Sequence, residues 1–226
     1  MILVHPFFIN PLAIKNNKIN VIVLEQQQLF TKFIAEIFSQ ISSGVGSFVL
    51  SQDGKQIDLS KTMDIVVDVF NISVNQKKAV NKLHTVLSSI AQESEYYLPT
   101  NELLTNINVY LGTIIKEQFL SLTYNEALDI LGIFKFADVK FVEEKECLPE
   151  KLIDYMEVMR EYCGLEYFVF VNLKSYISTS ELKAFYQDIL YQGFNVILVE
   201  SRIDSESNGL EELENIVILD KDLCEF

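Results

Sequence analysis

The sequence predicts an α/β fold in which helices cover a parallel sheet. Residues 167–172 and 194–199 are apolar on both faces, as strands buried on both sides of a sheet must be. Between these segments, Ser178 and Glu181 have the spacing of a helix capping box, and the apolar residues that follow recur at helical intervals. Gly193 stands where a left-handed helix C-terminus is expected. These observations predict a strand–helix–strand unit with a right-handed crossover.

Upstream of this unit, the hydrophobic pattern predicts more of the same sheet. Strands of the buried type are expected at residues 20–24 and 63–70, and apolar residues at helical spacing predict a helix at 26–42. The dipeptide Asp53-Gly54 is a strong hairpin signal, so we expect a β-hairpin on the edge of the sheet.

Three consecutive helices are predicted in the middle of the chain, at residues 75–92, 101–120 and 125–135, with a break at 93–99. They form a candidate helical insertion. After it we expect a strand at 138–142, a helix at 150–163, a polar loop at 204–214 and a last strand at 216–219. The predicted domains are an α/β head, residues 1–62 and 137–226, and a helical leg, residues 63–136.

Composition excludes several classes of protein. No apolar run reaches the ~20 residues of a membrane span, and the amino terminus, interrupted by Pro6 and Pro11, is typical of a strand and turn rather than a signal peptide. The three cysteines have no metal-ligand spacing, which indicates free thiols in a reducing compartment. We therefore expect a cytoplasmic protein without a membrane segment.

The charge is unevenly distributed along the chain. The net charge is −14, yet the first 92 residues hold eight lysines against six acids, so that they carry +2 and the remainder −16. All eight positive charges there are lysines, and the only arginines are Arg160 and Arg202. Lysine suits phosphate contacts, whereas base recognition favours bidentate arginine. Any DNA contact should come from the first 92 residues and show little sequence preference.

Two enzyme classes lack their motifs. Strand 20–24 runs into Glu25 and three glutamines, without the glycines or the Lys-Ser/Thr pair of a phosphate loop, so no nucleotide is expected. The only histidines, His5 and His84, are not part of a nucleophile motif, and His84 is expected on the solvated side of its helix.

A metal-dependent nuclease is the sharper enzyme hypothesis. Asp138 or Asp129, followed by Glu143 and Lys145, loosely matches an arrangement that positions a divalent ion and activates a water molecule. A solvated charge run is the alternative interpretation of this segment. Glu25, at the carboxyl end of its strand, is either a metal ligand or a buried or capping carboxylate. A third hypothesis is an acidic scaffold that binds only proteins.

Four stretches of the chain, in order and spacing, resemble a known family: residues 21–34, 63–84, 123–143 and 168–202. That family is the Csn-type CRISPR-associated protein, the ring-forming adaptation factor of type II-A systems. The resemblance implies a head similar to a P-loop ATPase core without its phosphate loop, together with a helical leg. It also implies a homotetrameric ring whose lysine-lined hole takes double-stranded DNA at free ends, without catalysis.

The same resemblance implies partners and sites. Its members act in spacer acquisition with the CRISPR integrase subunits and the type II effector nuclease, and several bind calcium. Glu25 matches the family's first-strand calcium ligand. The other calcium ligands lie in an acid-rich segment, which here is shorter and keeps only Glu117, Glu126 and Asp129. The expected DNA contacts are Lys55, Lys61, Lys77, Lys78 and Lys82, followed by Lys32 and Lys116.

Overall fold

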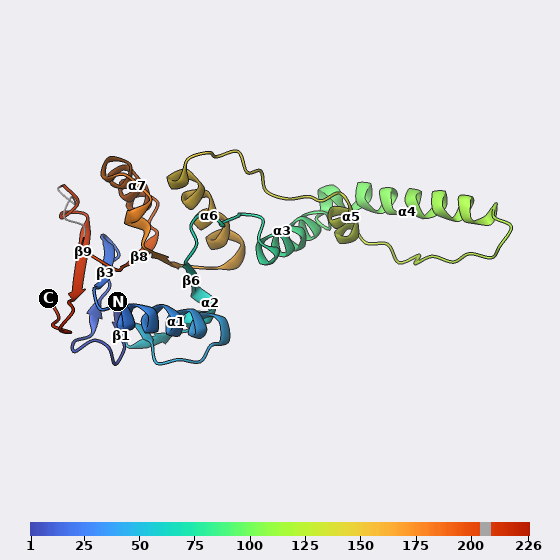
Figure 1. Cartoon of the computed structure of the whole chain (residues 1–226). Coiled ribbons are helices and arrows are strands. Elements are labelled where there is room, and N and C mark those ends of the chain that lie inside the picture. Colours follow the sequence, from blue (N-terminus) through green and yellow to red (C-terminus); the bar gives the residue numbers. More distant parts are fainter. Residues whose placement is uncertain (204–208) are drawn as a thin grey trace. The chain divides into compact units, whose positions relative to one another are not determined.

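The computed structural model describes residues 1–203 and 209–226 and divides into two compact units (Figure 1). The α/β unit consists of Met1–Val74 and Glu144–Phe226, and the helical unit of Asn75–Glu143. The sequence prediction had drawn the boundaries at residues 62/63 and 136/137. The predicted polar loop at 204–214 lies partly outside the described residues.

A five-stranded parallel sheet organises the α/β unit and confirms the predicted fold class. The strand order is β6-β7-β8-β3-β9, and every neighbouring pair is parallel. The strands are β6 (Met63–Val66), β7 (Tyr167–Val171), β8 (Asn195–Glu200), β3 (Ile19–Leu24) and β9 (Glu214–Leu219). Since β6 pairs with β7, the structure puts Met63–Val66 with the sheet, whereas the predicted boundary put them with the leg.

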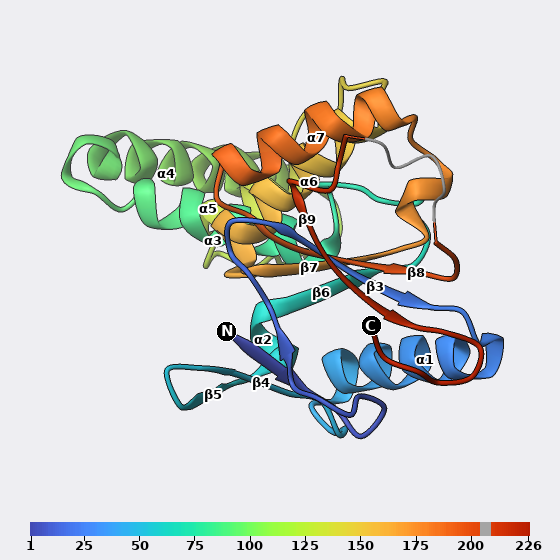
Figure 2. The same cartoon turned by 90° about the vertical axis from the view of Figure 1, so that its left-hand side faces the viewer.

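Helices cover both faces of this sheet, as the apolar strands require. Helix α1 (Gln27–Ser43) lies on one face, and α6 (Leu148–Cys163) and α7 (Thr179–Tyr191) lie on the other (Figure 2). Every residue of β3 and β7 is buried, so both faces of these strands contribute to the core. The predicted start of α7 is confirmed: Ser178 and Glu181 form its capping box.

The amino-terminal residues build a second, antiparallel sheet of order β2-β1-β4-β5. Its strands are β1 (Ile2–Val4), β2 (Leu12–Ala13), β4 (Val49–Gln52) and β5 (Lys55–Ile57), and the short helix α2 (Leu59–Thr62) follows. The hairpin at Asp53-Gly54 is confirmed, but its predicted place on the edge of the main sheet is wrong. The reason is that β4 pairs with β1, and Leu3 and Leu50 pack in the core cluster that contains α1.

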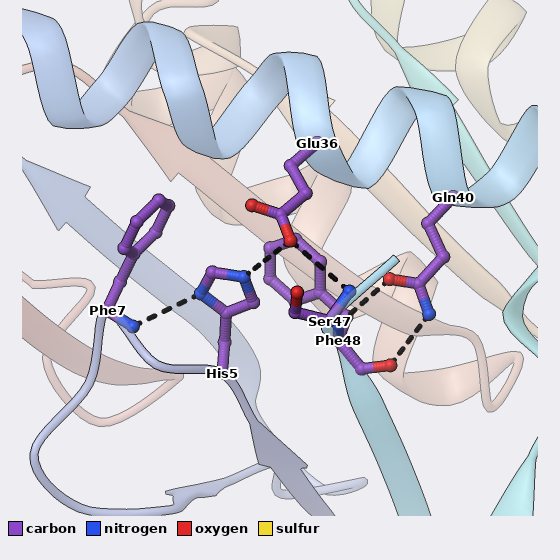
Figure 3. Close-up of polar contacts among 6 residues, drawn as sticks. All are labelled: His5, Phe7, Glu36, Gln40, Ser47 and Phe48. Carbon is purple, nitrogen blue, oxygen red and sulfur yellow. Dashed lines mark hydrogen bonds and ion pairs between the residues drawn. The ribbon is translucent and has the colours of Figure 1, made fainter. Parts of the chain in front are cut away.

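A buried polar cluster joins the small sheet to α1 (Figure 3). The side chain of Gln40 on α1 bonds both the N–H and the carbonyl of Phe48, at 2.9 and 2.7 Å. His5 is stacked on the Phe48 ring, its Nδ1 accepts the Phe7 N–H at 3.2 Å, and its Nε2 lies 3.0 Å from Oε1 of Glu36. Because Nδ1 accepts a hydrogen bond, the N–H of the neutral ring is on Nε2 and faces Glu36. This contact holds the pKa of the Glu36 carboxyl below its ordinary value.

A buried ion pair ties the other face of the sheet together. Lys174, in the short 3-10 helix η1 (Leu173–Ser175) after β7, has a side chain only 8% exposed, and its Nζ lies 2.6 Å from Oε1 of Glu214. The Tyr186 hydroxyl of α7 donates to the same oxygen at 2.8 Å. The N–H of Lys174 donates to Oε1 of Glu200 at 3.1 Å. A buried charge needs such partners, because desolvation is costly.

The helical unit contains α3 (Lys77–Ile90), α4 (Ser94–Lys116) and α5 (Ile130–Phe136). The predicted break at 93–99 is wrong, because α4 already begins at Ser94 and runs through Pro99. Proline there removes one donor, which leaves only the carbonyl of Glu95 without its helical partner, and Glu95 is exposed. Helix α5 begins later than predicted because Asp129 caps it, its carboxylate accepting the Gly132 N–H at 2.5 Å.

The predicted strand at 138–142 is absent from the described residues, which are irregular there. Side chains rather than a neighbouring strand satisfy this backbone. The Asn75 amide bonds both the N–H and the carbonyl of Phe141, at 2.9 and 3.0 Å. Nε2 of His84 lies 2.7 Å from the carbonyl of Val139. His84 is therefore 5% exposed, and its predicted position on the solvated side of the helix is wrong.

Replacing Glu36 by glutamine should destabilise the protein in a pH-dependent way. Since folding lowers the pKa of Glu36, its contribution is present above the unfolded value near 4.5 and is lost as the pH falls through the folded pKa. Urea unfolding should show the variant below the wild type at about pH 7 and converging with it as the pH falls through the folded pKa of Glu36. The matched control is Glu157→Gln at an exposed position of α6, which should show no such convergence. A pH-independent difference would contradict the assignment.

Replacing Lys174 by methionine should leave Glu214 charged, buried and unpaired. We expect a loss of about 3–5 kcal/mol in the free energy of unfolding. The double variant Lys174→Met, Glu214→Gln removes the stranded charge and should recover part of this loss, while Lys183→Met, at an exposed position of α7, should change little. Equal stabilities of the single and double variants in urea titrations would show that the ion pair is not what holds these elements.

Candidate nucleic-acid interface

Three of the predicted DNA contacts lie together on α3. Lys77, Lys78 and Lys82 are exposed, and Lys78 and Lys82 are one helical turn apart. Within the described residues, none of the three is paired with a carboxylate, and α3 itself contains no acid. The structure therefore brings these three predicted residues onto one short, purely basic helix.

Two of these lysines stand where a helix does not favour them. Lys77 and Lys78 occupy the first turn of α3, where the macrodipole is positive and acids are preferred. The N-cap residue Gln76 makes no capping hydrogen bond with its side chain. Positive charge at this end lowers helix stability, so local helix energetics do not account for its presence.

The other predicted DNA contacts are exposed at separate places. Lys116 lies in the last turn of α4, where the macrodipole favours a cation. In the α/β unit, Lys32 lies on α1 and Lys55 on β5. Lys61 is exposed but lies 3.1 Å from the Asp58 carboxylate, which reduces its availability for a phosphate.

The predicted calcium ligands do not form a site in the described part of the chain. No three His, Cys, Asp or Glu side chains come together there as a metal-binding group. Glu117 and Glu126 are exposed, and Asp129 uses a carboxylate oxygen to cap α5. Glu25 is half-buried directly after β3. Because calcium takes six to eight oxygens, this arrangement does not fit the ion, and its binding remains a prediction.

The nuclease arrangement is also not assembled. The strand that would carry it is missing, and Asp138 instead pairs with Lys140 at 2.6 Å, a hydrogen bond that lowers the pKa of the Asp138 carboxyl. Lys145 lies 3.6 Å from Glu150. Both Asp138 and Lys145 therefore have partners outside the proposed set, and the geometry offers no support for a metal-activated water.

Sequence reasoning missed two features of the α/β unit. The ion pair of Lys174 and Glu214 was not foreseen, because nothing in a lone lysine after a strand indicates that it is buried. Asn172, which ends β7 in a left-handed conformation with φ of 52°, was also missed. Its signal was present: a polar residue stood at the carboxyl end of a predicted parallel strand, where ligands often bind.

Comparisons with solved structures return ATP-binding cassettes at low identity. The chain is similar to a nucleotide-free ATP-binding cassette from an ABC transporter, with 8% identity, 95% of this chain and 82% of that chain covered, and a TM-score of 0.45. It is also similar to cbiO1 from Clostridium perfringens, part of the ABC transporter complex cbiONQ, with 12% identity, 96% and 79% of the two chains covered, and a TM-score of 0.46.

In the described residues, no helix is both long and apolar enough to cross a membrane.

A comparison with protein families gives a more specific result. The family described as CRISPR-associated protein (Cas_Csn2) matches residues 40–223, a span that includes the whole helical unit and most of the parallel sheet. The match covers well over half of the sequence, so the chain belongs to the CRISPR-associated Cas_Csn2 family.

Proposed function

We propose that this protein binds double-stranded DNA at its ends, without reading sequence, as a homotetrameric ring that acts in CRISPR spacer acquisition and catalyses no reaction. The single observation that carries the proposal is α3, a helix with three exposed lysines and no acid in a chain of net charge −14. Family membership supports the CRISPR context. The CRISPR integrase subunits and the type II effector nuclease are the proposed partners.

The chemistry of α3 favours phosphate over base recognition. Lysine is a flexible point charge with no fixed fork for a base edge. Phosphate neutralisation releases counterions, so binding should fall steeply as salt is added. The strongly acidic remainder of the chain would repel DNA, which restricts contact to the basic surface.

A closed ring explains a preference for ends. A duplex can enter a closed hole only by threading, so linear DNA is admitted and covalently closed DNA is excluded unless the ring opens. The ring and the preference for DNA ends are therefore one hypothesis, because threading through a closed ring requires a free end. Calcium, if it binds, would act on the ring and not on chemistry.

Helix α4 supports self-association. None of its 23 residues is buried among the described residues of this single chain. A mostly apolar stripe runs along it with alternating spacings of four and three residues, the period of a coiled-coil seam. We call it the α4 stripe: Tyr96, Thr100, Leu103, Ile107, Tyr110 and Ile114. Tyr110 is 65% exposed, which is costly for an aromatic residue without a partner.

The α4 stripe is complementary to itself in one orientation. If two copies of α4 pair antiparallel about Thr105, Leu103 of one copy lies beside Ile107 of the other. Glu95 near the start of one helix then lies close to Lys116 at the end of the other. Such an arrangement is isologous, as a two-fold interface must be.

Linear and relaxed circular duplexes of the same sequence should behave differently in a gel shift. We expect linear DNA to shift, uncut, and circular DNA not to shift, with calcium and chelator lanes reporting any effect of the ion. Equal shifts would contradict threading, a shift of neither form would leave the acidic scaffold, and cleavage would indicate a nuclease.

Replacing Lys77, Lys78 and Lys82 by glutamine should weaken DNA binding and reduce its salt dependence, because each lost phosphate contact lowers the slope of log K against log [salt] by about one. Fluorescence titrations at several salt concentrations measure this. The matched control changes three exposed lysines of the acidic part, Lys151, Lys183 and Lys221, and should bind like the wild type. Equal losses in both triple variants would argue against α3 as the contact.

Introducing Leu103→Glu and Tyr110→Glu should reduce the oligomer, because two charges would enter the α4 stripe. Analytical ultracentrifugation should show a smaller species. Val109→Glu lies on the same helix, 64% exposed but off the stripe, and should leave the mass unchanged. An unchanged mass in the double variant would exclude this interface.

A further inference from the structure

An aromatic hollow lies at the carboxyl ends of β6 and β7 in the α/β unit. Its volume is about 400 Å³, within the range of small-molecule sites. Residues of α1 line it together with residues at the ends of the two strands. Its walls include Phe30, Phe38, Val67, Asn172 and Tyr176. Phe38 and Tyr176 are about half exposed, at 52% and 49%, so aromatic surface is left open to solvent.

One polar group in this hollow is held in a defined orientation. The Asn172 N–H donates to the carbonyl of Val199 at 2.9 Å, and its side-chain oxygen accepts the Ser201 N–H at 3.0 Å. Because the oxygen is engaged, the amide cannot be flipped, and the side-chain NH₂ remains as a donor. Tyr176 is also positioned, since its ring packs edge to face on Phe70 at 5.1 Å. The site therefore offers flat apolar faces and a fixed hydrogen-bond donor.

A cation adjoins this hollow. Thr31 lines it and also lines a neighbouring hollow of about 390 Å³, which is formed by Gln27, Gln28, Thr31 and Lys32. Lys32 is exposed, and within the described residues it is not paired with a carboxylate. The aromatic faces and the amide donor thus line one hollow, and a lysine lines a second hollow that shares Thr31 with it.

We propose that this composite site holds an unpaired nucleotide, with its base against the aromatic side chains and its phosphate near Lys32. Aromatic side chains stack on any base, the Asn172 amide donates to an acceptor on the base edge, and the lysine neutralises the phosphate. A purely apolar partner side chain would use neither Asn172 nor Lys32. The nucleotide comes either from the frayed or overhanging end of a DNA duplex, which rests on the proposed function, or from a free mononucleotide.

The test uses 2-aminopurine as the single overhanging 3′ nucleotide of a linear duplex. The chain contains no tryptophan, so protein emission does not obscure the probe. We expect its fluorescence to be quenched on binding and the overhang duplex to bind at least about fivefold more tightly than the blunt duplex, as stacking on an aromatic side chain provides. Tyr176→Ala should remove both effects. Tyr191→Ala, at a 92% exposed tyrosine on α7, should keep them.

Asn172→Asp is a second variant, because aspartate keeps the acceptor for Ser201 and tolerates the left-handed conformation but loses the donor. In a separate experiment, deoxyadenosine monophosphate is titrated and the NMR resonances of the tyrosines are followed. The Tyr176→Ala, Tyr191→Ala and Asn172→Asp variants are compared. Equal binding of blunt and overhang duplexes without quenching would overturn the DNA-terminal source while DNA binding itself stands. If no duplex binds, the proposed function fails, and the mononucleotide titration alone decides: perturbation of Tyr176 supports the site, and its absence overturns it.

Discussion

The structure depends on the need of a parallel sheet to be covered on both faces. Strands β3 and β7 are buried at every residue, so neither face is available to water. Helix α1 covers one face of the sheet, and α6 and α7 cover the other (Figure 2). The same constraint decides what is polar inside: Lys174 is retained beneath α7 only with Glu214 and Tyr186 around it.

The sequence alone was sufficient to predict those elements that local signals determine. The capping box of α7 and Gly164 after α6 are set by the residues themselves, and both are present as expected. Strands β3, β7 and β8 were predictable because a run that is apolar on both faces has few other structures available. The family resemblance rested partly on these segments, and it identified the correct family.

What could not be predicted depends on contacts between distant residues. The segment at 138–142 has the composition of a strand, but Asn75 and His84 satisfy its backbone from far away in the sequence. His84 was placed in solvent because its own helix gave no sign of Val139. Similarly, α4 alone has no core, so its apolar residues predicted a helix without indicating what covers them. The candidate DNA contacts show the same limit. The sequence alone indicates that a lysine is exposed, but it does not show which other side chains lie beside that lysine.

The side chain of Asn75 has a consequence for how the arm can vary. It binds both backbone groups of Phe141, so the first and nearly the last residues of the helical unit are fastened to each other at its base. Because these two residues are held together, the segment between them connects to the α/β unit as a short closed loop would. Because the entropy of closing a loop grows only slowly with its length, a turn of helix added to or removed from the helical unit beyond this pair of hydrogen bonds would change the folding free energy of the α/β unit little.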